Sequence, residues 1–334
     1  MEKKKKYRLF DFFNYHRDNT IDAIEEDTTP TIKRYFKLLG RRFWKLVSLN
    51  LMMLPTIIPI LVAIYIYFGI KQTPTANDFL FPQLYGANAV ASSPSISFLL
   101  DLFGGQLNIP VYGTLTYIGI AICILLLLVT FGWQNVGASY ILRNMVRGEP
   151  IFIWSDYFYA IKRNLKQGIL LGILDFVIIF LLGFDIMYFW GQTGTFVLDI
   201  GFFTVCALII IYFFMRFYLY LLLVTFELSI RKILKNALIF SILGFKRNIM
   251  GLLGIVLVTI LNIALFPLFG MTPLGIALPL ILPFLYYLAV TAFTGAYAAY
   301  PIIERYMVTP YFDTAQDEEE DLTETVDESE KTNE

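Results

Sequence analysis

The stretch GILLGILDFVIIFLLGFDIMYFW, residues 168–190, decides the fold of this chain. Apart from two aspartates it carries no charged side chain. A helix of about 20 apolar residues crosses the hydrocarbon core of a bilayer, so this stretch predicts a transmembrane helix. Five further segments of the same kind lie near residues 46–70, 112–141, 200–224, 249–270 and 274–300. The sequence therefore predicts an all-α fold, a polytopic membrane bundle of six transmembrane helices, with the membrane domain at 46–305.

The composition agrees with a membrane protein and excludes several other classes. Of the 334 residues, 57% are hydrophobic, 17% are aromatic and only 16% are charged, and the mean hydropathy is +0.64. An average soluble domain has about 25% charged residues. These values exclude a soluble enzyme, a disordered protein and a nucleic-acid binder, and they make the lipid bilayer the expected partner of the chain.

The distribution of lysine and arginine predicts the orientation of the bundle. Segment 1–45 carries twelve basic residues, and loops 142–167 and 225–248 carry five each. Loop 71–111 carries one basic residue, and loop 191–199 carries none. Loops rich in lysine and arginine stay in the cytoplasm. We therefore expect both termini in the cytoplasm, an extracytoplasmic loop at 71–111, and a multi-pass protein of the cell (cytoplasmic) membrane.

The cytoplasmic N-terminal segment contains a predicted amphipathic helix that runs into the first span. Thr29-Pro30 is a favourable helix start, because a capping hydroxyl is followed by proline. Ile32, Phe36 and Leu39 then recur at helical spacing. The basic residues between and after them form a predicted membrane-surface patch of Lys33, Arg34, Lys37, Arg41, Arg42 and Lys45. The other two basic loops predict similar helices. Such helices can grip anionic lipid, bind a cytoplasmic partner or act only as anchors.

Two segments outside the spans have distinct compositions. Residues 306–334 include eleven acidic residues between Asp313 and Glu334 and almost no apolar ones, which predicts a disordered cytoplasmic tail. Loop 71–111 is long and apolar for a connection, so we expect it to fold back onto the membrane or onto the bundle.

Three charged residues fall at membrane depth, where a charge is costly and marks a candidate functional site. Asp175 in the third span and Arg216 in the fourth lie at similar depths from the cytoplasmic side, and they form a candidate intramembrane ion pair. Asp185 is a candidate polar site near the outer interface. Three interpretations of the first two remain open: mutual neutralisation, an Arg216 side chain that reaches the interface alone, and a site for a solute or a proton.

Small residues predict close helix packing. Gly168 and Gly172 form a GxxxG pattern in the third span, and Gly295 and Ala299 belong to a face of small residues in the sixth. Prolines in the first and sixth spans either break these helices around a binding site or are tolerated as kinks.

The chain offers little for catalysis. Its single histidine is His16, and its two cysteines, Cys123 and Cys206, lie inside apolar runs. These residues cannot build a zinc site or a Cys–His nucleophile pair. We therefore expect no cofactor, no metal and no enzymatic activity.

A faint repeat links two spans. Lys162-Arg163-Asn164 opens the third span and Lys246-Arg247-Asn248 opens the fifth, at an offset of 84 residues. Duplication of a helical hairpin explains this repeat, and so does a shared basic composition.

Several separate motifs between residues 125 and 305 resemble one family in the right order. They are Thr130-Phe131-Gly132, Val136-Gly137-Ala138-Ser139-Tyr140, Arg147-Gly148-Glu149, Asp156-Tyr157-Phe158 and Leu234-Lys235-Asn236-Ala237-Leu238. This pattern resembles the YesL-like family of bacterial integral membrane proteins, a domain of unknown function. The stretch Arg41-Arg42-Phe43-Trp44-Lys45-Leu46 is similar to the longer clostridial-type variant of that family. Trp133 departs from the proline that usually follows the first motif.

The resemblance implies a function without enzymatic activity. Members of the family often accompany carbohydrate ABC-type uptake systems, which implies an accessory or regulatory role and ABC transporter subunits as partners. The alternative is a small-solute transporter or channel, in one variant a homo-oligomer, that uses Asp175 and Arg216.

Overall fold

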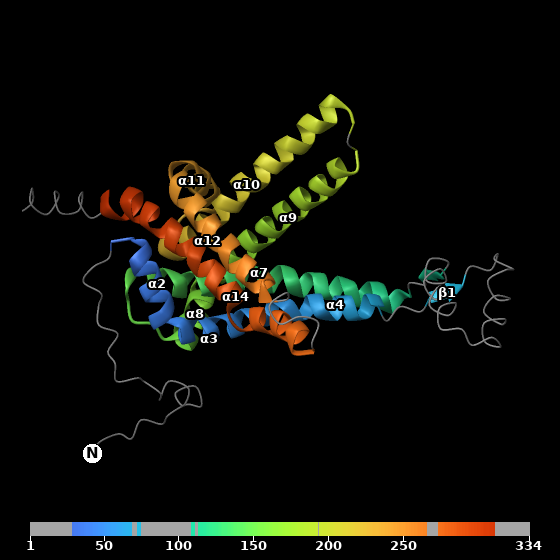
Figure 1. Ribbon diagram of the computed structural model, residues 1–334, viewed down its shortest axis with the longest axis horizontal. Coiled ribbons are helices and arrows are strands. Elements are labelled where there is room, and N and C mark those ends of the chain that lie inside the picture. Colours follow the sequence, from blue (N-terminus) through green and yellow to red (C-terminus); the bar gives the residue numbers. More distant parts are fainter. Residues whose placement is uncertain are drawn as a thin grey trace, which may run out of the picture. The chain divides into compact units, whose positions relative to one another are not determined.

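The computed structural model describes residues 29–68, 72–74, 108–110, 113–192, 194–265 and 273–310 (Figure 1). The chain divides into two compact units, one formed by residues 56–127 and the other by residues 1–55 together with 128–334. The second unit contains all the charged sites discussed below.

Helices dominate the described chain, and their bounds set the frame for the sites. They are α2 (Ile32–Arg41), α3 (Phe43–Met53), the 3-10 turn η1 (Leu54–Ile57), α4 (Ile58–Phe68), α7 (Thr114–Arg147), α8 (Ile153–Arg163), α9 (Leu165–Trp190), α10 (Phe196–Thr225), α11 (Ile230–Leu243), α12 (Phe245–Ile263), α14 (Pro273–Ile303) and the π-helical turn η2 (Glu304–Val308). The predicted helical fold class is confirmed. The β structure of the described residues is one antiparallel ladder of β1 (Gln72–Pro74) with β2 (Asn108–Pro110).

Within the described residues, six helical stretches are long and apolar enough to cross a membrane, as predicted. They are Phe43–Tyr67, Thr114–Arg147, Leu165–Trp190, Phe196–Thr225, Phe245–Ile263 and Ile281–Val308. Most extend farther at their basic ends than the hydropathy predicted, because helical hydrogen bonding continues after the apolar run stops. In α7 it stops only at Gly148, whose φ of 80° suits glycine. There the Gly148 N–H donates to Met145 and the Glu149 N–H to Asn144, which is a Schellman motif.

The prolines act differently in the first and last spans. Pro55 lies in η1, which separates α3 from α4, so the first span is interrupted. α14 starts at Pro273, where the missing N–H costs nothing, and it continues through Pro279 and Pro283. Helical structure also continues to Pro310, so the first five residues of the expected disordered tail are helical. The rest of that tail lies outside the described residues, as does most of loop 71–111.

Three short helices precede the odd-numbered spans, and we call α2, α8 and α11 the elbow helices. Each ends at a single residue with non-helical dihedral angles, at which the following span begins. These break residues are Arg42 (φ −107°, ψ 16°), Asn164 (φ −112°, ψ 24°) and Gly244 (φ −84°, ψ 11°). The N–H of each break residue bonds four residues back, and its carbonyl accepts from four residues ahead. The three elbows therefore share one backbone hydrogen-bond pattern at the break.

This arrangement corrects two expectations for the first elbow. The capping residue of α2 is Thr31, whose hydroxyl accepts from the Arg34 N–H at 3.3 Å, and not Thr29. α2 also does not run into the first span, because the break at Arg42 ends it.

The buried core lies toward the elbow end of the larger unit. α10 is buried continuously from Tyr218 to Val224, whereas the helix beyond Val205 toward its start at Phe196 is mostly exposed. α3, the last part of α7 and the second half of α14 supply the other large buried side chains, which include Leu46, Leu49, Ile141, Met145, Phe293 and Tyr300. α9 and α10 extend from this core as an antiparallel pair (Figure 1).

Candidate functional site

Asp175 is the centre of a polar cluster between α9 and α10. Its side chain has no exposed surface. Arg216 Nε lies 3.1 Å from Asp175 Oδ1. The Tyr212 hydroxyl donates to Oδ1 at 2.7 Å, and the Tyr220 hydroxyl donates to Oδ2 at 2.9 Å. Three side chains of α10 thus surround one carboxylate of α9.

Helix geometry explains why these three donors meet. Tyr212, Arg216 and Tyr220 follow one another at intervals of four residues, so they lie on one face of α10. Asp175 is about 15 Å from the start of α9, and Arg216 is about 14 Å from the end of α10, at 1.5 Å per residue. Because α9 and α10 are antiparallel neighbours, residues at equal distances from the start of one and the end of the other lie side by side, and the two charges meet.

The structure therefore brings together the two residues of the predicted ion pair. Arg216 keeps 33% of its side chain exposed, and its guanidinium lies over the Phe131 ring, 5.7 Å from the ring centre. The prediction missed Tyr212 and Tyr220, because tyrosines in a membrane protein are commonly interfacial. Their four-residue spacing from Arg216 was the signal that could have identified them.

Asp185 does not join this cluster. It lies ten residues after Asp175 on α9, about 15 Å farther along the helix. Its side chain is half-buried. It therefore stands apart as a single polar group toward the C-terminal end of α9.

Glycines hold α9 against α7 beside the cluster. A Cβ atom at Gly132 would overlap the carbonyl oxygen of Gly168, and a Cβ atom at Gly172 would overlap the backbone of Gly132. The predicted GxxxG pair of α9 thus has its counterpart in Gly132, which was not predicted. In α14, a Cβ atom at Gly295 would lie 2.8 Å from the Phe217 ring, and Ala299 is fully buried.

The residues of the predicted basic patch at the first elbow differ in their exposure. Lys33, Lys37 and Arg41 are exposed, and Lys45 is half-buried. Arg34 and Arg42 are buried, with 7% and 3% of their surface exposed, so they do not belong to a membrane-surface patch. Both guanidinium groups point inward, because backbone carbonyls at the end of α7 and just after it accept hydrogen bonds from them.

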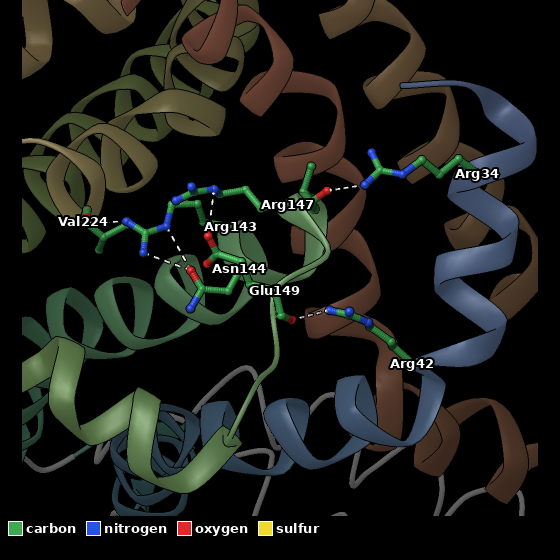
Figure 2. A network of polar contacts seen from close by, with 8 residues as sticks. Arg34, Arg42, Arg143, Asn144, Arg147, Glu149 and Val224 are labelled. Carbon is green, nitrogen blue, oxygen red and sulfur yellow. Dashed lines mark hydrogen bonds and ion pairs between the residues drawn. The ribbon is translucent and has the colours of Figure 1, made fainter. Parts of the chain in front are cut away.

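Arginines bind the ends of helices and form a network (Figure 2). Arg34 donates to the Val146 carbonyl in the last turn of α7 at 2.8 Å, and Arg42 donates to the Glu149 carbonyl at 3.2 Å. Arg143 donates to the Val224 carbonyl near the end of α10 at 2.8 Å. Helix C-termini carry carbonyls without intrahelical partners and a partial negative charge, so a guanidinium suits them.

Arg143 is itself held in position by its neighbours. Its Nε and Nη2 both donate to Asn144 Oδ1, at 3.1 and 2.9 Å. Its guanidinium also lies 4.6 Å from the centre of the Tyr140 ring. Beside it, Arg147 and Glu149 form an ion pair at 3.0 Å that is partly exposed. The network therefore joins the ends of α7 and α10 to the first elbow.

The other two elbows also donate to a backbone carbonyl, from positions that are equivalent to each other but lie three residues later than that of Arg42, which is itself a break residue. Gln167, three residues after the break at Asn164, donates to the Leu228 carbonyl at 3.4 Å. Arg247, three residues after the break at Gly244, donates to the Pro30 carbonyl at 3.3 Å. Leu228 and Pro30 each stand two residues before an elbow helix. Each elbow thus contacts the segment that leads into the next elbow, and the third contacts the segment before the first.

This cycle corrects the predicted repeat. Structurally equivalent break residues are Asn164 and Gly244, which are 80 residues apart. The first tripeptide, Lys162-Arg163-Asn164, ends at its break residue. The second, Lys246-Arg247-Asn248, begins two residues after its break residue. The two tripeptides are not equivalent, although the elbows that contain them are. Asn248 is buried instead, where it accepts from the Tyr218 hydroxyl at 2.7 Å and donates to the Ser241 carbonyl at 2.9 Å.

Two further features bear on chemistry. Within the described ranges, no group of three or more His, Cys, Asp or Glu side chains could hold a metal ion. An apolar groove of about 360 Å³ lies inside the smaller unit, between α4 and the first part of α7, and Pro59, Tyr67 and Cys123 are among its lining residues. It presents no charged group to a ligand.

The fold and this site define a multi-pass integral membrane protein. Residues 111–186 match the model of a family described as a protein of unknown function, DUF624. The matched segment includes α7, α8 and most of α9, and therefore Gly132, Gly168 and Asp175. No curated protein and no solved structure matches the chain.

Proposed function

We propose that this chain is a non-enzymatic accessory protein of the cell (cytoplasmic) membrane, a YesL-like protein that associates with a carbohydrate ABC-type uptake system. The motifs quoted above support the family, and the DUF624 match is consistent with it. The partner follows from the family's association with such systems. Contacts with ABC transporter subunits are thus the expected mode of action, and both termini lie in the cytoplasm.

One observation favours an accessory role over transport by this chain alone: the Asp175 carboxylate has its hydrogen-bonding capacity filled by protein groups. This carboxylate is fully buried and accepts from Tyr212, Arg216 and Tyr220. Transporter sites at this depth are commonly formed by discontinuous helices with open backbone groups. α9 and α10 are continuous past the cluster. The charges therefore neutralise each other and lock the two helices together.

The alternative, a small-solute transporter or channel working as a homo-oligomer, has one observation in its favour. Arg216 keeps a third of its side chain exposed within the span. A neighbouring copy or a solute could approach that part of the guanidinium, whereas the carboxylate is out of reach.

Two experiments separate these functions. Affinity purification from native membranes, followed by mass spectrometry, should recover the permease subunits of a sugar uptake system, and an unrelated six-span bait should not. Purified protein in liposomes should move no sugar above the level of protein-free vesicles. Flux that Arg216→Met abolishes and Tyr188→Phe leaves intact would instead establish the transporter.

Reporter fusions test the orientation. Fusions at residues 20, 155, 240 and 320 should report the cytoplasm, and fusions at residues 90 and 195 should report the outside. An outside location at residue 155 would contradict the orientation, because that position lies in an elbow helix between two basic segments.

A further inference from the structure

The elbow helices are fixed in rotation by what they bury. α2 buries Arg34 and Leu38, and α8 buries Tyr157 and Ala160. α11 buries Ile233, Ala237, Phe240 and Ser241. The cycle of contacts through Arg42, Gln167 and Arg247 brings all three elbows to the same end of the bundle. The face that each elbow presents outward is therefore defined.

Each outward face carries large apolar side chains. Ile32 and Phe36 of α2 are 61% and 58% exposed, and Ile242 of α11 is 65% exposed. On α8, Trp154 and Phe158 are both exposed, and their rings stack with centres 6.4 Å apart. The three elbow helices therefore present exposed apolar side chains at the same end of the bundle, and we call this surface the elbow layer.

The elbow helices, together with the three residues that follow each of them, are strongly basic. Ten exposed side chains carry this charge: Lys33, Lys37, Arg41, Lys162, Arg163, Lys166, Arg231, Lys232, Lys235 and Lys246. Asp156 is the single acidic residue within the three elbow helices. The elbow layer therefore combines exposed apolar surface with an excess of positive charge.

We propose that the three elbow helices form a collar that selectively binds the headgroups of anionic phospholipids. Exposed Trp, Phe and Ile side chains beside lysines and arginines are suited to the boundary between headgroups and acyl chains. Anionic lipids supply the complementary charge there. An acidic soluble protein could meet the charge, but it would leave the apolar side chains without an apolar medium. The collar is independent of the accessory role.

The test compares bound lipid in nanodiscs of phosphatidylcholine mixed in equal amounts with phosphatidylglycerol. Native mass spectrometry counts the lipids that remain on the released protein. One variant replaces five exposed collar lysines with glutamine, namely Lys33, Lys162, Lys166, Lys232 and Lys235. A matched variant replaces the same five with arginine, which keeps the charge. Circular dichroism checks that both variants retain their helices.

The wild-type protein should retain phosphatidylglycerol in excess over phosphatidylcholine, and the arginine variant should do the same. The glutamine variant should lose preference by about fivefold for each lysine that reaches a headgroup. Equal retention of the two lipids by the wild type would overturn the proposal. So would an unchanged preference in the glutamine variant, or a preference lost equally in the arginine variant.

Discussion

Tyr212 and Tyr220 lie two helical turns apart on α10 and donate to opposite oxygens of one carboxylate, that of Asp175. Arg216 lies midway between them and contacts the same group. A single residue of α9 thus fixes both the rotation and the axial position of α10. Several predictions about stability rest on this relationship and on the other contacts of the bundle.

Loss of either tyrosine hydroxyl should weaken the pairing of α9 with α10. Tyr220→Phe should lower the free energy of unfolding by about 2 kcal/mol, because a hydrogen bond to a charged acceptor is lost. Tyr212→Phe should have a similar effect. Tyr188→Phe, at an exposed position near the C-terminal end of α9, is the matched control. Unfolding in detergent micelles measures all three, and equal effects at Tyr188 and Tyr220 would contradict the cluster.

Removal of one charge should cost more than removal of both. Arg216→Met leaves the buried Asp175 carboxylate without its counter-charge and should cost about 3 kcal/mol. The double variant Asp175→Leu with Arg216→Met removes the uncompensated charge and should recover part of this loss. The same unfolding assay tests it. A double variant less stable than the single Arg216→Met variant would exclude the ion pair as the source of the effect.

The crossing of α7 and α9 should not tolerate a methyl group. Gly172→Ala places a Cβ atom against the Gly132 backbone and should cost about 1–3 kcal/mol, the usual range for overpacking. Gly183→Ala is the matched control on the same helix, because a Cβ atom there meets nothing within 4 Å. Since alanine favours a helix, that control should be neutral or stabilising. A stable Gly172→Ala variant would mean that the helices are farther apart.

Adjacent basic residues of α2 should differ sharply in their contribution. Arg34→Gln removes the guanidinium that donates to the Val146 carbonyl and should cost about 2 kcal/mol. Lys33→Gln, one position earlier and exposed, should change stability by less than about 0.5 kcal/mol. Hydrogen exchange at the end of α7 should rise for Arg34→Gln alone. Equal behaviour of the two variants would place Arg34 at the surface.

Asp156 should make the second elbow sensitive to pH. Burial raises the pKa of its carboxyl above 3.8, and the hydrogen bond from the Phe152 N–H opposes the rise. The stability that this group contributes is therefore fully present below pH 3.8 and is lost as the pH increases through the folded-state pKa. Asp156→Asn should remove this dependence. Hydrogen exchange of the α8 amides across that range compares the two proteins, and identical pH profiles would contradict the shift.

Hydropathy and charge counts predicted the parts of this structure that depend on the bilayer. The six spans follow from apolar length, and the meeting of Asp175 with Arg216 follows from their depths. Both properties belong to single helices and can be read along the chain. The helix ends were less predictable, because α7 stops at Gly148 through local backbone geometry and not where its apolar run stops.

Features that depend on a tertiary partner escaped the sequence analysis. Nothing in the local pattern distinguishes Arg34 from Lys33, since the inward direction of Arg34 is set by the Val146 carbonyl, 112 residues away. Gly132 likewise gains its role only from Gly168 and Gly172. The three breaks fall on Arg42, Asn164 and Gly244, three unrelated residue types, so their shared geometry was visible only in the fold.

The cycle of elbows has a consequence for the order in which this protein matures. Arg247 and Tyr297 bind the carbonyls of Pro30 and Thr31, across 217 and 266 residues of chain. A ribosome makes the first elbow long before it makes either of these donors. The earliest segment therefore waits, without its final contacts, until the last hairpin has entered the membrane. A chain truncated before α12 keeps the bonds of Arg34 and Arg42 to the Val146 and Glu149 carbonyls but lacks both donors to Pro30 and Thr31, which gives quality control a means of recognising incomplete molecules.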